Sequence, residues 1–329
     1  MGGCLSRGPP NGCNVSSTAG VNERRIRVIS AVRCSTEVAA ALAAGRPLVA
    51  LESTITSRLG LPAPFNRECF DRVNAAIRAA GAVPAVTAVI HGELWAGIEP
   101  HHEALVLGAD EKLAERDLPV AMAATRTGVT TVSATVTIAG LAGIRVFATG
   151  GIGGVHRGAE LSFDVSSDLG AIARHPVIVV TAGAKAFLDL PKTLEVLETL
   201  SVPVVGYQTD DFPAFWSRSS GLPLGHRVES ANEIAAIATA HASIGWRGGM
   251  VVANPIPLAA EIPAVDIADA IATGLTEAER AGAVGPKATP KILAAIAAAT
   301  DSRSIPANLA LAESNASLAG EIAVALSKR

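Results

Sequence analysis

The chain has 329 residues and a formal net charge of -3, and hydrophobic residues, mostly Ala, Val, Leu and Ile, make up 49% of it. Aromatic residues make up only 3%, which argues against a stacking platform for single-stranded nucleic acid, and no long basic run offers a duplex-binding surface. We therefore expect no nucleic-acid partner, whereas a small anionic substrate needs only a local cluster of hydrogen-bond donors.

Residues 1 to 34 are rich in Gly, Pro, Ser and Asn and show no sustained hydrophobic period. We expect them to form a disordered tail before a single α/β catalytic domain at 35–329. Gly2 lies in a short acylation pattern that we interpret as a chance match, and no secretory apolar segment follows. The four cysteines are Cys4, Cys13, Cys34 and Cys69. Because none forms a C-x-x-C pair, we expect neither a zinc site nor a disulfide framework, and we expect a cytoplasmic protein.

Short apolar runs alternate with helical stretches along most of the chain. A first helix is predicted to begin after Ser35, a plausible N-cap. The predicted strands are Leu48–Leu51, Val83–Ile90, Arg145–Ala148, Val177–Thr181, Val202–Gly206 and Met250–Ala253. The predicted helices are 67–80, 130–142, 191–200 and 233–244, followed by a C-terminal helical segment at 264–281, 290–299 and 307–325. This alternation predicts an α/β fold with a layered, largely parallel central sheet flanked by helices.

The stretch 127–144 carries no charge, and its length approaches that of a membrane span. It is rich in Thr, Ser and Gly, and charged residues flank it on both sides. We interpret it as a buried helix of a soluble protein and expect no membrane partner.

Ligands of open α/β sheets bind beyond the carboxyl ends of the strands, so the residues after each predicted strand are the candidate site. Glu52 follows the first strand, where a carboxylate acts as a general acid/base or belongs to a helix cap or salt bridge. Lys185 follows the strand at 177–181 among small apolar residues. Burial there would disfavour the ammonium and leave an amine that forms a Schiff base with a sugar carbonyl. Alternatively, its stem packs on the sheet and its head reaches water.

A glycine-rich loop follows the strand at 145–148, with five glycines in residues 149–158. It fits neither the dinucleotide-binding pattern nor the P-loop, so it is a ligand loop of unknown type or a flexible turn. Beyond it lie Asp164, Ser166, Ser167 and Asp168. Their oxygens suit a hard cation or a sugar, and they equally suit helix capping. The segment 206–221 holds four of the eleven aromatic residues, which wall off a pocket or anchor a surface loop.

Together these segments resemble the pseudouridine-5′-phosphate glycosidase family, also called the indigoidine synthase A-like family. The matching runs include ALESTI at 50–55, FATGGIGGVHRGAELSFDVSSDL at 147–169, VTAGAKAFLDLPKTLEVLE at 180–198 and PVVGYQTDDFPAFWSRSSG at 203–221. The resemblance covers about residues 36 to 327. It implies reversible cleavage of pseudouridine 5′-phosphate by water to uracil and ribose 5-phosphate, a divalent metal such as Mn²⁺, and a homotrimer.

The resemblance also implies roles for individual residues. Lys185 matches the nucleophile, which forms an imine with the ring-opened ribose, Glu52 matches the proton donor, and Asp164 matches the metal ligand. The positions that match substrate contacts or other family motif positions are Lys112, Val132, His156, Ser166, Ser167, Asp168 and Asn308.

Four positions depart from the family pattern. A serine and a second basic residue are usual where Ala114 and Glu115 stand, a glycine where Val129 stands, and a small or basic residue where Trp95 stands. These changes leave open a lysine-dependent lyase or glycosidase that acts on another sugar phosphate. A carbohydrate-kinase-like protein is a further alternative, although no ATP phosphate-binding motif occurs. A non-catalytic binding module would require Lys185 to be inert.

Overall fold

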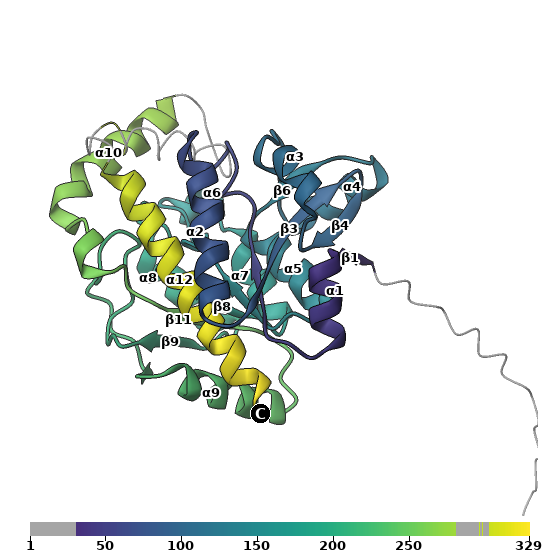
Figure 1. Ribbon diagram of the computed structural model, residues 1–329. Coiled ribbons are helices and arrows are strands. Elements are labelled where there is room, and N and C mark those ends of the chain that lie inside the picture. Colours follow the sequence, from purple (N-terminus) through teal and green to yellow (C-terminus); the bar gives the residue numbers. More distant parts are fainter. Residues whose placement is uncertain (1–30, 281–295, 297, 299–302) are drawn as a thin grey trace, which may run out of the picture.

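The computed structural model describes residues 31–280, 296, 298 and 303–329, and Figure 1 shows a central sheet with helices packed around it. Among these residues the strands form one 11-stranded sheet with the order β1-β4-β3-β2-β7-β8-β11-β9-β10, and β6 and β5 branch from β3. The strands are β1 Val32–Cys34, β2 Leu48–Leu51, β3 Val83–Ile90, β4 Glu93–Ala96, β5 Lys112–Leu113, β6 Gly128–Thr130, β7 Val146–Ala148, β8 Ile178–Thr181, β9 Val204–Tyr207, β10 Arg227–Val228 and β11 Met250–Ala253.

The sheet is largely parallel, as predicted. Only the pairs β3–β4 and β3–β6 run antiparallel among the described strands. All residues of β2, β7, β8 and β11 are buried, because helices cover both faces of the sheet and leave those strands no polar side. Continuous apolar runs of this kind are what made these strands recognisable in the sequence.

Helices cover both faces of the sheet. They are α1 Thr36–Ala43, α2 Phe65–Ala79, α3 Glu103–Leu107, α4 Leu118–Ala123, α5 Val132–Ala142, α6 Ala159–Ser162, α7 Ser167–Arg174, α8 Leu190–Thr199, α9 Ala231–Ser243, α10 Ala264–Arg280 and α12 Ser304–Ser327. In Figure 1 α2 and α12 lie side by side in front of the sheet, and α5 and α7 lie behind it. The helix predicted at 290–299 falls almost wholly outside the described residues.

The strand β1 corrects the boundary predicted at residue 35. Residues 32–34 fall in the predicted tail, yet β1 pairs with β4 in parallel. Val32 is buried, and Arg33 Nη2 lies 2.9 Å from a carboxylate oxygen of Glu93. A strand of three residues is too short to reveal a period, which is why the sequence did not indicate it. Residues 1–30, with Cys4 and Cys13, lie outside the described part of the chain.

Close packing of small residues holds α12 in the fold. A Cβ at Gly320 would lie 2.6 Å from the Cβ of Ala80, just beyond the end of α2, so the two chain segments approach too closely for a larger residue. By length and composition α12 is apolar enough to cross a membrane, but 61% of its most apolar window is buried inside the protein. It is therefore a core helix. The apolar stretch at 127–144 forms strand β6 and then α5, a short helix that is mostly buried.

Candidate active site

The candidate site lies where the parallel strands β2, β7 and β8 end side by side. Glu52 follows β2, Thr149 follows β7, and Lys185 comes after a turn that leaves β8. Gly183 in that turn has a φ of +91°, and a Cβ there would meet the carbonyl oxygen of Pro213 at 2.1 Å. Only glycine fits this turn, which brings Lys185 back to the edge of the sheet.

Two adjoining hollows open at this edge, and they share Glu52, Thr54, Lys112 and Lys185. We call the first the polar lobe, whose further lining includes Arg116, Thr131, Val132, Gly153, His156, Asp164, Ser166, Ser167, Asp168 and Phe187. We call the second the apolar lobe, whose further lining includes Ile55, Leu59, Leu61, Gly150, Gly151, Phe215 and Asn308. The predicted nucleophile and proton donor therefore lie between two chemically different compartments.

The carboxyl group of Glu52 is half-buried and accepts a hydrogen bond from Thr149 Oγ1. Burial raises the pKa of Glu52, although the cationic Lys185 and the hydrogen bond from Thr149 act in the opposite direction. Glu52 therefore keeps its proton to a higher pH than an exposed carboxyl group does. This is the property required of a proton donor near neutral pH.

Backbone hydrogen bonds tie Lys185 to the glycine-rich loop. The Lys185 amide donates to Ile152 O at 3.1 Å, and the Ile152 amide donates to Gly183 O at 3.1 Å. Within the described residues, no hydrogen bond or ion pair holds the Lys185 ammonium group, so the group is available to a ligand in either lobe. Burial, and then the charge of Lys185, lower the pKa of the neighbouring Lys112.

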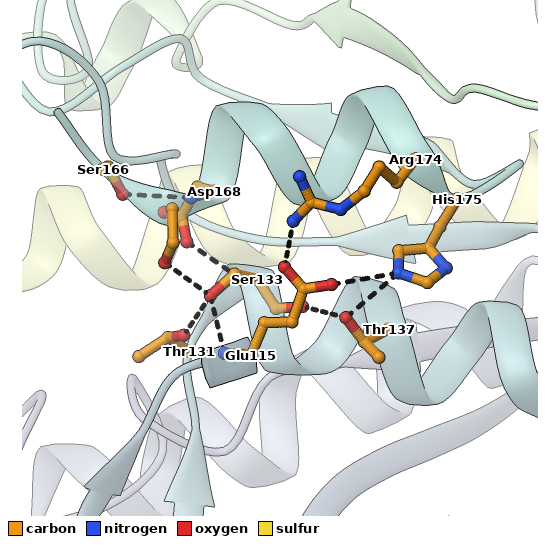
Figure 2. Close-up of polar contacts among 9 residues, drawn as sticks. Glu115, Thr131, Ser133, Thr137, Ser166, Asp168, Arg174 and His175 are labelled. Atoms are coloured by element: carbon orange, nitrogen blue, oxygen red, sulfur yellow. Dashed lines mark hydrogen bonds and ion pairs between the residues drawn. The ribbon is translucent and has the colours of Figure 1, made fainter. Parts of the chain in front are cut away.

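The carboxylate of Asp168 joins three segments around the polar lobe. Asp168 is buried, and it accepts hydrogen bonds from Gly153 N at 2.8 Å and from Ser133 N at 2.9 Å. The hydroxyl of Ser166 caps α7 by accepting from Asp168 N, and Ser167 Oγ lies 3.1 Å from Ser133 Oγ. Figure 2 shows the contacts of Asp168 with Ser133 and Ser166 between the starts of α5 and α7. The acid and hydroxyl cluster thus acts at least partly in capping, which was one of the two interpretations of the sequence.

Glu115 and Arg116 lie next to each other in the chain but serve different surroundings. In Figure 2 the carboxylate of Glu115 meets Arg174 and His175, and its contact with His175 Nε2 is 3.3 Å. Burial opposes ionisation, but the hydrogen bonds from His175 and Arg174 prevail and lower the pKa of Glu115. Glu115 does not line either lobe, whereas Arg116, which sequence reasoning missed, lines the polar lobe.

Asp164 and His156 face each other in the polar lobe. Their carboxylate oxygen and ring Nδ1 are 3.8 Å apart, and the His156 amide donates to Asp164 O at 3.0 Å. Burial lowers the pKa of His156 against the pull of Asp164. In the part of the chain that the structure describes, no group of three or more His, Cys, Asp or Glu side chains could hold a metal ion. A cation at Asp164 would therefore complete its shell with water or ligand oxygens, as Mg²⁺-like ions commonly do.

All the predicted site residues line one of the two lobes. Asn308 lines the apolar lobe, and the other predicted substrate contacts line the polar lobe. Arg116, Thr149 and Phe215 were not among the residues predicted from the sequence. Thr149 follows β7 directly, so the end-of-strand rule contained the signal for it. Phe215 belongs to the aromatic segment for which a pocket wall was one alternative.

Comparisons with known proteins agree with this geometry. The family model described as indigoidine synthase A like protein matches residues 37–325. A pseudouridine-5′-phosphate glycosidase of Methylobacterium nodulans is 53% identical over 88% of this chain and 86% of its own length. One of Roseobacter denitrificans is also 53% identical, over 90% of this chain and 96% of its own.

A solved structure is also similar to this chain. It is the prealnumycin C-glycosynthase AlnA in complex with ribulose 5-phosphate, which superposes with a TM-score of 0.83 and 36% identity over 90% of this chain and 97% of its own. The match to the family model and the high identity to curated relatives cover nearly the whole described fold. The chain therefore belongs to the indigoidine synthase A-like family.

Proposed function

We propose that this protein is a pseudouridine-5′-phosphate glycosidase, which cleaves the carbon–carbon bond between uracil and ribose 5-phosphate in nucleotide catabolism. The observation that carries the proposal is the position of Glu52 and Lys185 between a polar lobe and an apolar lobe. A sugar phosphate suits the polar lobe and a flat base suits the apolar one, so the scissile bond would lie beside both residues. The names of relatives at about 50% identity support the same reaction.

The reaction begins, in this proposal, when the Lys185 amine attacks C1′ of the ribose. The nitrogen–C1′ bond forms as the C1′–O4′ bond breaks, and Glu52 gives its proton to O4′ and takes one back from the attacking nitrogen. The C1′–C5 bond of the base then breaks, and its electrons pass to the uracil ring. Glu52 protonates C5, and the C1′=N imine remains on Lys185. Water adds to the protonated imine and releases ribose 5-phosphate and the free amine, and the proton set free in this step returns to Glu52.

The polar lobe supplies what a phosphate group needs. Lys112 and Arg116 bring cationic side chains, and α5 and α7 both begin at this lobe. The first amides of a helix and its dipole favour anions. This combination supports a 5′-phosphate bound at the far side of the ribose from Lys185.

We also propose that Asp164 holds the divalent metal, with Mn²⁺ as the natural candidate. A single carboxylate, half-buried beside the proposed phosphate subsite, fits a hard cation that keeps several water ligands. When bound, such a cation would neutralise part of the substrate charge.

The homotrimer and the cytoplasmic location belong to the same proposal. Leu161 and Phe163, in and just after α6, are 88% and 86% exposed although both are large and apolar, and contact with a second subunit would cover them. Cys34 and Cys69 are free thiols, which fits a reducing compartment. Light scattering of the purified protein tests the oligomeric state.

The direct test is to incubate the pure protein with pseudouridine 5′-phosphate and Mn²⁺ and to follow free uracil. Uridine 5′-phosphate, which carries the same base on a carbon–nitrogen bond, is the control substrate, and Lys185→Arg, which keeps the charge but cannot form an imine, is the control variant. We expect uracil only from pseudouridine 5′-phosphate and only with Lys185 present. If the protein releases base from another nucleotide but not from pseudouridine 5′-phosphate, it is instead a lyase for a different sugar phosphate.

A further inference from the structure

We propose that Trp216 determines which hydrogen-bonding edge of the base the enzyme accepts, because it fixes the orientation of the side-chain amide of Asn308. The inference rests on the proposed function and concerns the base-binding part of the same site. Trp216 lies in the aromatic segment 206–221, in which the sequence distinguished no single residue, and it is 1% exposed. It is a positioning residue, since it acts on the ligand only through Asn308.

The orientation of the amide follows from one hydrogen bond. The indole Nε1 of Trp216 lies 2.8 Å from Asn308 Oδ1. An indole N–H can only donate, so the amide must present its carbonyl oxygen to Trp216 and its NH₂ group elsewhere. Among the described residues no partner accepts from that NH₂ group, and Asn308 lines the apolar lobe. The NH₂ group is therefore a donor available to the base.

Trp216 is itself held in a preorganised position. Its neighbour Phe215 adopts a left-handed backbone with a φ of +64°, and the Phe215 amide donates to Ala182 O at 3.0 Å. The rings of Phe215 and Trp216 meet edge to face with centroids 4.8 Å apart. A Cβ at Gly151 would approach the Phe215 ring to 2.5 Å, so the glycine-rich loop packs directly on this aromatic pair. A strained residue held this firmly is typical of a site that orients a ligand.

The other partner, Asn308, is held through its helix. Asn315, two turns further along α12, donates from Nδ2 to Thr149 O at 2.8 Å and accepts from Asn254 Nδ2 at 2.9 Å. These buried bonds fix α12 against the ends of β7 and β11. The backbone at both ends of the Trp216–Asn308 bond is therefore held in place, and the indole donor sets the orientation of the amide between them.

A fixed NH₂ donor selects the chemistry of the base edge that meets it. Uracil presents a carbonyl oxygen at both C2 and C4, and either would accept this hydrogen bond. A base with an amino group at that position would place a donor against the NH₂ donor of Asn308 and leave that NH₂ group unpaired in the apolar lobe. The geometry thus points to a base with two carbonyl groups, and it rejects the amino analogues of the same shape.

The test compares pseudouridine 5′-phosphate with its two amino analogues, in which an amino group replaces the C2 or the C4 carbonyl. In Trp216→Phe the ring remains but the donor is lost, so the amide is free to turn. We expect the preference of the wild type for pseudouridine 5′-phosphate over the disfavoured analogue, measured as kcat/KM for base release, to fall about tenfold or more. KM should account for most of this change. Trp246→Phe, at a tryptophan that is 45% exposed, is the matched control and should keep the preference.

A second variant keeps the test decisive if Trp216→Phe does not fold. Asn308→Asp still accepts from Trp216 but turns an oxygen toward the base, so it should favour the amino analogue. An unchanged preference in a folded Trp216→Phe protein, or an Asn308→Asp protein that still prefers pseudouridine 5′-phosphate, would overturn the inference. If the wild type releases no uracil, the proposed function fails. The role of Trp216 can still be tested by calorimetry, because the ratios of affinities for the three nucleotides should change in the variants in the same way.

Discussion

Glu52→Gln should inactivate the protein and stabilise it at the same time. Glutamine keeps the shape of the side chain, and its carbonyl oxygen can accept the hydrogen bond that Thr149 now donates to Glu52. It removes the transferable proton, so we expect uracil release to fall by roughly a hundredfold or more, the usual range for a general acid/base group. Substrate affinity should change far less, because the lining of both lobes stays in place.

The gain in stability follows from the pKa of Glu52, which burial raises from about 4.5. Below that pH the carboxyl group is protonated in the folded and unfolded states, and it has no effect on their balance. As pH rises from about 4.5 to the folded-state pKa, the unfolded wild type ionises while burial keeps the folded carboxyl group protonated, so the wild type loses stability, whereas glutamine does not titrate. The difference grows by about 1.4 kcal/mol for each unit by which the folded pKa exceeds the unfolded one. Each kcal/mol corresponds to roughly 2 °C in melting temperature for a protein of this size.

Glu115→Gln is the matched control, because its shift has the opposite sign. Hydrogen bonds from His175 and Arg174 outweigh burial and lower the pKa of Glu115. The ionised Glu115 therefore stabilises the folded state above about pH 4.5, and this stabilisation is lost as pH falls through the folded pKa. Thermal melts of both variants between pH 4 and 8 should show Glu52→Gln above the wild type and Glu115→Gln below it at neutral pH. A Glu52→Gln protein that turns over at the parental rate, or that melts below the wild type at pH 8, would refute the reasoning.

Three further predictions concern the nucleophile, the metal and the N-terminus. Borohydride added during turnover should trap a ribose phosphate adduct on the peptide that contains Lys185, and mass spectrometry that finds the adduct on Lys112 would reassign the nucleophile. Asp164→Ala should weaken Mn²⁺ binding in calorimetry and lose activity, and full activity of this variant in chelator would contradict the metal role. Deletion of residues 1–30 should leave the melting temperature unchanged. Deletion of residues 1–34 also removes β1, and the loss of buried Val32 alone should lower the free energy of unfolding by about 2 kcal/mol. Equal melting temperatures of the two deletion variants would show that β1 contributes nothing to stability.

The strands that carry the candidate site could be predicted because their sequences are continuously apolar. The predicted and observed bounds of β2, β3 and β11 coincide, and those of β8 differ by one residue. Since the carboxyl ends of parallel strands lie at one edge of the sheet, the positions of Glu52 and Lys185 after their strands placed both at that edge. Family resemblance then added Lys112, which no local pattern would have indicated.

Other features depend on contacts between distant segments. The strands β5 and β10 have two residues each, too few to express a period of two. Glu115 and Arg116 show a second kind of limit, because a single turn of 3-10 helix at Glu115–Asp117 sends one toward α7 and the other toward the polar lobe. The choice between them depends on where Arg174 lies, nearly sixty residues further along the chain.

The position of α12 has a consequence for biosynthesis. This helix follows every other described element in the chain, yet it supplies Asn308 to the apolar lobe and, through Asn315, a bond to Thr149 O. A nascent chain whose sheet is already formed therefore still lacks one wall of the apolar lobe until α12 has left the ribosome. A ribosome that stalls before α12 leaves a chain that contains Glu52 and Lys185 but whose apolar lobe is incomplete.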